Sequence, residues 1–454
     1  MSQSGGVNEA VFVRGSILRH VLVMSATGSV GLVSVFIVDL LSLIYISWLG
    51  KPHLTAGVGF ATQISFFYIS MQVGLSIAVG ALVARQIGAG DRSGARQIAA
   101  SALFHIAVLT FVLSLASLPL VKPMLELIGA KGETLEAALL FSYITIPSNA
   151  LLALGMATSS VLRAVGDARR SMYVLLSGAI VTALLDPILI LVLRFDVAGA
   201  AASTVVARCI YACIGFWGVI RVHDMLGGVT PAGLLRHLRP LLAIALPAIA
   251  ANLAAPVSTT YALKIFATYG EQVIAAITVV DRVTSVAFGA TFALSGAVGP
   301  VIGQNFGARR LDRVRSTLMI CYGVAIVYGL IVWAILAAGA PWIVTAFAAT
   351  GEMAELITFY MHIGVFAWLF LSCLFAANAA FNNLGYPMLA MIFNWGRGTL
   401  GTIPFVTIGA YYGGPKGGII GGGAGAALFG IIAIIVSFVI ANRLAARAEK
   451  KVTL

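Results

Sequence analysis

Long apolar stretches recur from one end of this chain to the other, and they limit it to one class of fold. Hydrophobic residues make up 60% of the 454 residues and charged residues only 10%, whereas charged residues make up about a quarter of a soluble domain. An α-helix of about 20 apolar residues crosses the hydrocarbon core of a bilayer, and no alternating pattern predicts transmembrane β-strands. We therefore expect an all-α integral membrane protein. Its twelve expected transmembrane helices cover residues 17–48, 54–84, 98–121, 134–162, 172–193, 198–220, 240–268, 272–303, 316–338, 350–382, 387–411 and 419–441.

Two matched landmarks indicate that the chain contains one unit written twice. The run VGALVARQIGAG at 79–90 is similar to VGPVIGQNFGAR at 298–309, and LRAVG at 162–166 lies opposite FNNLG at 381–385 with the same spacing. We therefore expect an N-terminal six-helix bundle at 1–222, a cytoplasmic linker at 223–239 and a C-terminal six-helix bundle at 240–454. Repeated halves in a membrane protein typically form a transport pathway.

The charged residues lie mainly between the apolar stretches, and their distribution orients the chain. The net charge is +12, and the excess of Lys and Arg falls on alternate loops such as Arg85–Arg96 and Arg309–Arg315. The positive-inside rule places these loops and both termini in the cytoplasm, and Met1–Gly15 lacks the pattern of a cleaved signal peptide. We expect a multi-pass protein of a bacterial-type cytoplasmic (inner) membrane. Its basic loops contact anionic lipid head groups, so the positive charge requires no nucleic-acid partner.

Familiar catalytic motifs are absent from the sequence. It contains no GxxxxGK[ST] phosphate loop, no HExxH, no CxxC pair and no GxSxG, so we expect neither an enzyme nor a cofactor. Cys209 and Cys213 are one turn apart on an expected helix; a metal pair is one interpretation, and packing by small polarizable side chains is the favoured one. Energy for transport must then come from a gradient of H⁺ or Na⁺.

Two acids inside apolar segments are the sharpest candidates for a functional site. Asp39 lies about 15 Å from the outer end of the 17–48 segment at 1.5 Å per residue, which is near the middle of the bilayer. Asp186 precedes Pro187, which cannot donate to the carbonyl of Ala183 and so predicts a kink. Intramembrane carboxyls usually face a cavity and serve function. We predict a proton site, or with further oxygens a Na⁺ site, at Asp39 and Asp186; the alternative is a purely structural hydrogen-bonding role.

Other polar residues accompany these acids in the first half. Thr182 lies one turn before Asp186 and shares its face, and Thr204 lies in the 198–220 segment. Either hydroxyl completes the cation-coupling site or bonds its own helix carbonyl. Arg208, one turn after Thr204, either pairs with an acid or extends toward the cytoplasm.

The second half offers a different set of intramembrane charges. Lys264, Asp281 and Arg282 form a possible second polar site, in which Asp281 pairs with Lys264 rather than with its neighbour Arg282 because adjacent helical residues point about 100° apart. A structural pair and a second coupling site both remain open. Arg397, His105 and His362 also fall inside apolar segments, and a hydrogen-bonded packing role is favoured for each histidine.

These segments together resemble one family, the multidrug and toxic compound extrusion (MATE) transporters. The resemblance covers essentially the whole chain and rests on segments in a fixed order: VDLLSLIYISWLG, ARQIGAGD, SSVLRAVGDARRSM, LLDPILI, GAAAST and GPVIGQNFGA. It implies two six-helix bundles related by a pseudo-twofold axis around a central V-shaped cavity. It further implies export of organic cations, including drugs, by alternating access in exchange for H⁺ or Na⁺.

Within that family the chain is most similar to the DinF-like branch. The resemblance implies coupling at Asp39, together with Asp186 and Thr204 of the same network. The chain has Thr182 where that branch often has asparagine, so a carbonyl ligand is lost. Acids common elsewhere in the family are missing at the corresponding places of the second half, which argues against coupling there alone.

A proton-coupled exporter of amphipathic, cationic small molecules is therefore the function that the sequence predicts, with a monomer as the default state. A flippase or exporter of a lipid-linked precursor or metabolite from the same superfamily is the alternative, kept open by Lys264, Arg282 and Arg397. A channel or receptor is the alternative from a different class. It would not require duplicated halves with buried protonatable acids.

Overall fold

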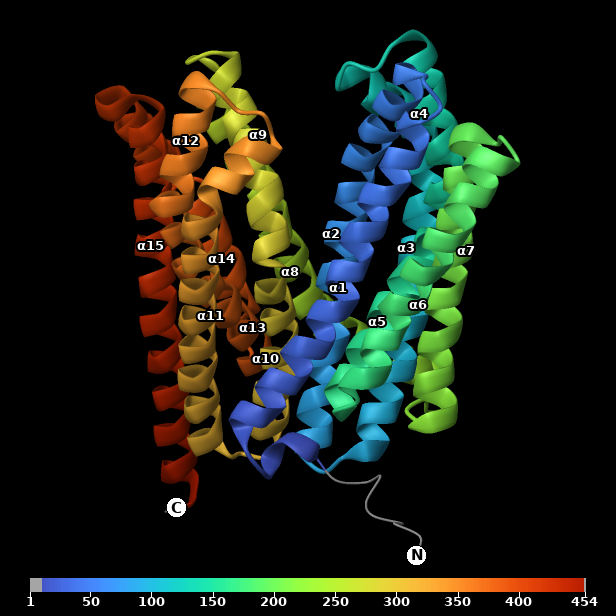
Figure 1. The fold of residues 1–454 in the computed structure, drawn as a ribbon. Coiled ribbons are helices and arrows are strands. Elements are labelled where there is room, and N and C mark those ends of the chain that lie inside the picture. The colour runs from blue at the N-terminus through green and yellow to red at the C-terminus, as the bar shows by residue number, and fades with distance from the viewer. Residues whose placement is uncertain (1–9, 453–454) are drawn as a thin grey trace, which may run out of the picture. The chain divides into compact units, whose positions relative to one another are not determined.

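The computed structural model describes residues 10–452, apart from the side chains at 40, 52 and 449–452. All regular structure within this range is helical, as Figure 1 shows. The all-α fold class expected from the apolar stretches is confirmed.

The described helices account for the twelve expected membrane crossings. Ten helical stretches are long and apolar enough to cross a membrane, and α9 (Glu271–Ala287) with α10 (Gly289–Gly307) adds one more as a pair bent by 43°. The stretch Pro387–Ala448 counts once but has 62 residues, about three times the length that one crossing requires. It folds back at Gly413 and Gly414, where the backbone leaves the helical conformation, and so supplies two crossings.

Glycines allow the two arms of this last hairpin to touch. Both arms lie within α15 (Ile403–Val452) and the turn before it, and Gly414 at their junction has φ +59°. A Cβ on Gly409 would lie 2.2 Å from the Gly417 carbonyl oxygen, and one on Gly425 would lie 1.6 Å from that of Gly401. Small residues permit such close backbone approach between membrane helices, which is why this part of the sequence is so rich in glycine.

The helices form two compact units, of which unit 1 comprises residues 1–11 and 30–249. Within it α2 packs along α4 and α5, and α6 lies beside α7 (Figure 1). Its core consists mainly of small and branched side chains, such as Val79, Ala157 and Val161, that are fully buried. The helices that lie wholly in unit 1 are α2 (Pro52–Gly88), α3 (Arg92–Leu127), α4 (Gly132–Thr145), α5 (Asn149–Val165), α6 (Ala168–Asp186) and α7 (Asp196–Trp217).

Unit 2 comprises residues 12–29 and 250–454. Its α13 packs against α10, α11, α14 and α15. Aromatic rings fill part of this core, where Phe288 stacks on Trp368 with ring centroids 4.8 Å apart. Besides α9, α10 and α15, it contains α11 (Leu311–Ala346), α12 (Gly351–His362), α13 (Ala367–Leu384) and α14 (Pro387–Gly398).

Two helices belong partly to each unit. The first part of α1 (Ile17–Ser47), up to Ser29, groups with unit 2, and the first part of α8 (Pro231–Ala267), up to Ile249, groups with unit 1. The compact units therefore divide the chain differently from the predicted bundles 1–222 and 240–454, and α8 begins inside the predicted linker 223–239. The physical reason is close packing: a Cβ on Gly74 of unit 1 would lie 2.5 Å from the Ile249 side chain.

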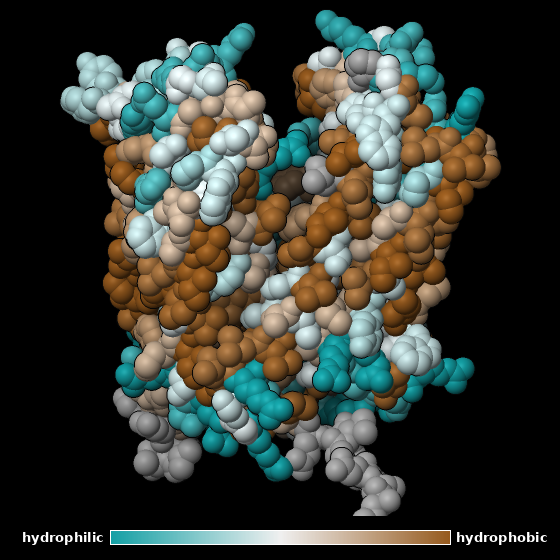
Figure 2. Space-filling model, viewed as in Figure 1, coloured by the Kyte–Doolittle hydropathy of each residue, from teal (hydrophilic) through white to brown (hydrophobic). Residues whose placement is uncertain are grey.

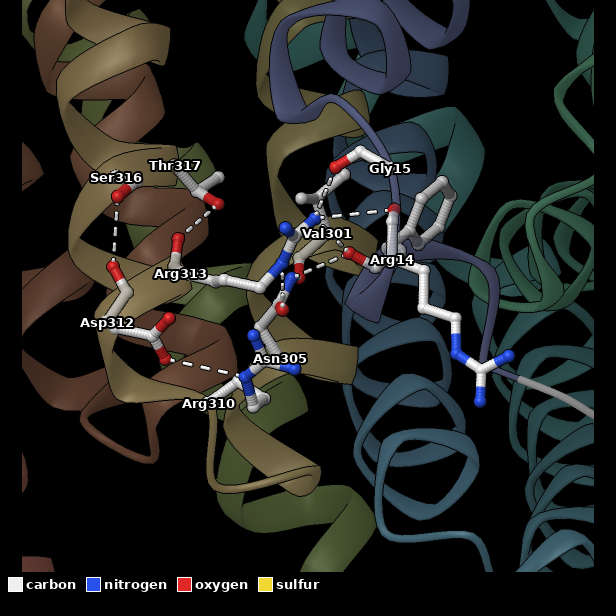
Figure 3. Close-up of polar contacts among 10 residues, drawn as sticks. Arg14, Gly15, Val301, Asn305, Arg310, Asp312, Arg313, Ser316 and Thr317 are labelled. Carbon is white, nitrogen blue, oxygen red and sulfur yellow. Dashed lines mark hydrogen bonds and ion pairs between the residues drawn. The ribbon is translucent and has the colours of Figure 1, made fainter.

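Hydrogen bonds tie the chain before α1 to unit 2. The Phe12 amide donates to the Gln304 side chain at 2.8 Å. Arg313 donates to the carbonyl oxygens of Phe12 and Gly15, both at 3.0 Å. Asn305 accepts from Arg313 Nε at 3.1 Å and donates to the Phe12 carbonyl at 3.2 Å. Figure 3 shows the Arg313 side chain extending from α11 toward this segment. We call the contacts of Phe12 and Gly15 with Gln304, Asn305 and Arg313 the N-terminal clasp.

The surface of each unit matches a bilayer. In Figure 2 hydrophobic residues cover the middle of each unit and hydrophilic residues cover both ends. Exposed large apolar side chains occur on most of the helices, as expected where lipid rather than water is the solvent.

Candidate functional site

Asp186 lies at the end of α6, where the helix changes its geometry. Pro187 has no backbone N–H to continue the α-helical pattern, and the chain continues as a π-helix, Pro187–Val192. The Asp186 side chain is 1% exposed. Its two carboxylate oxygens accept hydrogen bonds from the hydroxyls of Ser42 on α1 and Ser203 on α7. Burial disfavours the ionised form of this carboxyl, and the hydrogen bonds from the two hydroxyls favour it.

Asp39 faces the same region of unit 1. It lies on α1 one turn before Ser42, so both residues lie on one face of that helix. Its side chain is exposed in the structure, and it interacts electrostatically with Asp186 and Arg208. The structure therefore brings the two predicted acids together. One is buried and hydrogen-bonded, and the other is accessible.

Arg208 supplies a buried positive charge near these acids. It lies on α7, is 8% exposed, and donates to the Thr145 carbonyl at 2.6 Å, Ser148 Oγ at 2.8 Å and Asn149 Oδ1 at 3.1 Å. These acceptors surround the break between α4 and α5, where Pro147 interrupts the helix. From the sequence, Arg208 either pairs with an acid or extends toward the cytoplasm. In the structure its guanidinium donates to the acceptors at the break between α4 and α5, and it lies within electrostatic range of Asp39.

Neither of the two predicted threonines is a hydrogen-bond donor to Asp186. Thr204 donates to the Ala200 carbonyl of its own helix at 2.9 Å, and the hydroxyls that donate to Asp186 belong to Ser42 and Ser203 rather than to Thr182. Ser42 and Ser203 were missed. Two signals could have found them: Ser42 lies one turn after Asp39, and Ser203 is the other hydroxyl of the GAAAST segment.

The predicted second-bundle site does not form an ion pair in unit 2. Asp281 and Arg282 on α9 are both exposed, and Lys264 is exposed in the last turn of α8. Among the described ion pairs none joins Asp281 to Lys264 or to Arg282. Lys264 lies where a cation is favourable, at the negative end of a helix dipole. A packing role accounts for His362, which bonds the Thr358 carbonyl of its own helix at 2.8 Å.

A polar cluster outside the membrane joins three loops of unit 1. Asp167 caps α6 and accepts from the Arg170 amide at 3.0 Å, from the Arg170 guanidinium at 2.5 Å and from His223 Nε2 at 2.7 Å. Arg92 in turn donates to the His223 carbonyl. Partial burial opposes ionisation of Asp167, but the bonds from His223 and Arg170 outweigh it and lower its pKa well below the ordinary value.

The donor atoms at the acids suit a light cation. Within residues 10–452 no three His, Cys, Asp or Glu side chains group as ligands of a resident metal would. A proton at Asp39 or Asp186 needs only the carboxylate. Na⁺ would need further oxygen ligands, for which the hydroxyls of Ser42 and Ser203 are the nearest candidates.

Comparison with known proteins identifies the family. The model of the MatE family matches residues 29–188 and again 247–407, once in each half of the chain. The chain belongs to the MatE family. This match confirms the predicted MATE transporters as its family, and it confirms a transporter rather than an enzyme; the internal repeat also agrees with the double match.

Individual relatives of this MatE protein cover nearly its whole length. The FAD transporter of Shewanella oneidensis is 26% identical over 408 residues, which cover 88% of this chain and 89% of that protein. The multidrug export protein MepA of Staphylococcus haemolyticus is 24% identical over 408 residues, covering 88% and 86%. The chain is thus similar to membrane transporters of small molecules.

Solved structures share the fold. An outward-facing multidrug resistance MATE family transporter of the MOP superfamily superposes with a TM-score of 0.90, at 22% identity over 98% of this chain and 99% of that chain. A MOP superfamily transporter from Pyrococcus furiosus gives 0.89 at 22% identity, covering 98% and 99%. Twelve transmembrane helices in two bundles are therefore the architecture of this chain.

Proposed function

We propose that this transporter is a proton-coupled antiporter that exports amphipathic organic molecules and uses the Asp39/Asp186 pair as its coupling site. The observation that carries the proposal is the arrangement of the pair: an accessible acid, Asp39, within electrostatic range of a buried acid, Asp186, whose carboxylate is held by two hydroxyls. Two neighbouring carboxyls readily share one proton because a second negative charge nearby is unfavourable. Arg208 keeps the region from becoming strongly negative.

The proposed cycle follows from this electrostatics. A proton enters from outside and neutralises the acid pair, which weakens the hold on a positively charged substrate and lets it leave outward. Asp39 and Ser42 lie on one face of α1, so a change of charge at the pair acts directly on that helix. Reorientation then releases the proton to the cytoplasm and restores the negative charge. Na⁺ in place of H⁺ would use the same carboxylates.

Organic cations are the substrate class that this scheme favours, in keeping with the multidrug export relatives. We further propose that the protein is a monomer of a bacterial-type cytoplasmic membrane, with both termini inside. Membrane lipids surround it.

Efflux of a fluorescent organic cation from cells that lack their own pumps tests the coupling site. We expect Asp39→Asn and Asp186→Asn to abolish efflux, and collapse of the proton gradient to do the same in the wild type. Asp281→Asn is the matched control, because it neutralises an intramembrane acid of unit 2. Wild-type efflux by Asp39→Asn would refute the scheme, and loss of efflux only when the sodium gradient is collapsed would change the ion to Na⁺.

Anionic metabolites are a second candidate class of substrate. One relative across nearly the whole length is named an FAD transporter, and FAD carries two phosphates. Unit 2 also contains Arg397, whose buried Nε has no hydrogen-bond partner among the described residues. A lipid-linked precursor, which also carries phosphate, belongs to this class. Efflux of a phosphorylated fluorophore in the same cells would distinguish it from the organic cations.

A further inference from the structure

We infer that Arg397 forms a binding site in unit 2 for the anionic group, a phosphate or carboxylate, of the transported molecule. The inference rests on the proposed function and develops its second candidate class of substrate, the anionic metabolites. It does not rest on the identity of the coupling ion.

The position of Arg397 is the first observation. It lies on α14, ten residues after the helix begins at Pro387, and a rise of 1.5 Å per residue places it about 15 Å into the membrane. That depth is near the middle of a hydrocarbon core about 30 Å thick. Arginines near helix ends extend to the interface, but a side chain attached at mid-depth cannot reach either surface.

The helix is also interrupted immediately after this residue. α14 ends at Gly398, a turn follows, and α15 begins at Ile403. Discontinuous membrane helices commonly form the substrate sites of transporters, because irregular backbone at membrane depth is tolerated only inside protein or beside a water-filled cavity. The break satisfies its own backbone: Thr402 Oγ1 donates to the Arg397 carbonyl at 2.9 Å. The guanidinium is therefore not needed to hold the break together.

The missing partner is the decisive observation. Arg397 Nε is buried and has no hydrogen-bond partner within the described residues, and none of the described ion pairs includes this side chain. Arg208 in unit 1 shows the usual arrangement for a buried arginine, with three acceptors around one nitrogen. Arg208 thus bonds three protein acceptors, whereas the buried Nε of Arg397 has no partner among the described residues.

The chemistry of the guanidinium identifies its ligand. An intramembrane charge without a partner is costly and marks a functional site. A guanidinium binds carboxylates and phosphates through two parallel hydrogen bonds, and it keeps its charge at every physiological pH. Asp281 lies in the interior of α9, and no described ion pair joins it to Arg397; Asp312 and Glu355 of unit 2 pair with Arg310 and Lys416 instead. The ligand must therefore come from outside the protein.

A matched pair of fluorescent probes tests the site by equilibrium binding. Riboflavin and riboflavin 5′-phosphate share one ring system and differ by one phosphate. We expect the wild-type protein in phosphatidylcholine nanodiscs to bind the phosphorylated probe about tenfold or more tightly than riboflavin. Arg397→Gln should abolish this preference and leave riboflavin binding unchanged, while Arg397→Lys should retain part of it.

Two controls separate the outcomes. Arg282→Gln removes another intramembrane arginine of unit 2 and should retain the preference, and Asp39→Asn should retain it although it loses gradient-driven export. If Asp39→Asn exports at the wild-type rate, the proposed coupling is refuted, whereas the inference about the anion site at Arg397 is unaffected. If a lipid head group is the ligand, phosphatidylglycerol should stabilise the wild type, but not Arg397→Gln, against thermal unfolding. Equal responses of wild type and Arg397→Gln to both the phosphorylated probe and this lipid would overturn the inference.

Discussion

The hydroxyl of Ser203 gives a quantitative test of the Asp186 site. Ser203 is fully buried and donates to one Asp186 oxygen, and Ser203→Ala removes that donor without adding volume. A hydrogen bond to a charged group contributes about 1.5–3 kcal/mol, and each 1.4 kcal/mol is a factor of ten. If ionised Asp186 is an obligatory state of the cycle, its population falls about ten- to hundredfold, and export at neutral pH should fall with it.

The assay is proton-driven efflux from membrane vesicles across a range of internal pH. Because the variant disfavours the ionised carboxylate, we expect export by Ser203→Ala to recover as internal pH rises. Ser203→Thr retains a hydroxyl and should keep more activity. Thr204→Val is the neighbouring control, since the Thr204 hydroxyl bonds only its own helix, and it should remain within about twofold of wild type.

Equal activity of Ser203→Ala and wild type at every pH would refute this reasoning. So would a larger loss in Thr204→Val than in Ser203→Ala. Either result would mean that the hydroxyl contacts at Asp186 do not control its charge during transport.

Three further predictions concern stability. Asp167→Ala should lower the unfolding temperature at pH 7, because it removes a helix cap and its charge-assisted bonds. Because the pKa of Asp167 is lowered on folding, the difference in unfolding temperature between wild type and variant should be present above about pH 4 and shrink as the pH falls further. A difference that stays constant down to about pH 3 would contradict this prediction. Arg208→Leu leaves three acceptors without their donor and should destabilise unit 1 by about 3–5 kcal/mol in denaturant titrations, more than Arg208→Lys. Gly425→Leu should prevent accumulation of folded protein, because the new Cβ would lie 1.6 Å from the Gly401 carbonyl oxygen. Gly423→Ala should be tolerated, because the nearest atom to its Cβ would be 3.6 Å away. Equal yields of folded protein from the two variants would argue against the hairpin.

The fold was largely predictable because membrane crossing depends on local composition. The expected 17–48 segment corresponds to α1, and the folded stretch Pro387–Ala448 corresponds to two expected segments. The breaks were not predictable in the same way. Pro187 signalled the π-helix after α6. Gly401 and Pro404 are compatible with an end of α14, but glycine is frequent in this part of the chain, and the expected segment 387–411 ran through the break.

The candidate site was predictable in its acids and not in its hydroxyls. Depth along an apolar segment singles out Asp39 and Asp186 without any knowledge of packing. Choosing between Ser203 and Thr204 requires the rotation of α7, because adjacent residues point about 100° apart. The unpaired state of Arg397 also could not be read from the sequence, since it depends on which side chains face the guanidinium in three dimensions.

The N-terminal clasp has a consequence for the order of biosynthesis. Phe12 leaves the ribosome well before its partner Gln304, which follows 292 positions later. At the usual 5–20 residues per second, the start of α1 waits about 15–60 s before its final contacts exist. During that interval the insertion machinery or a chaperone must shield it. Truncation between the end of unit 1 and the start of α10 would leave the start of α1 without these contacts and exposed to quality-control proteases, even though unit 1 would already have been made.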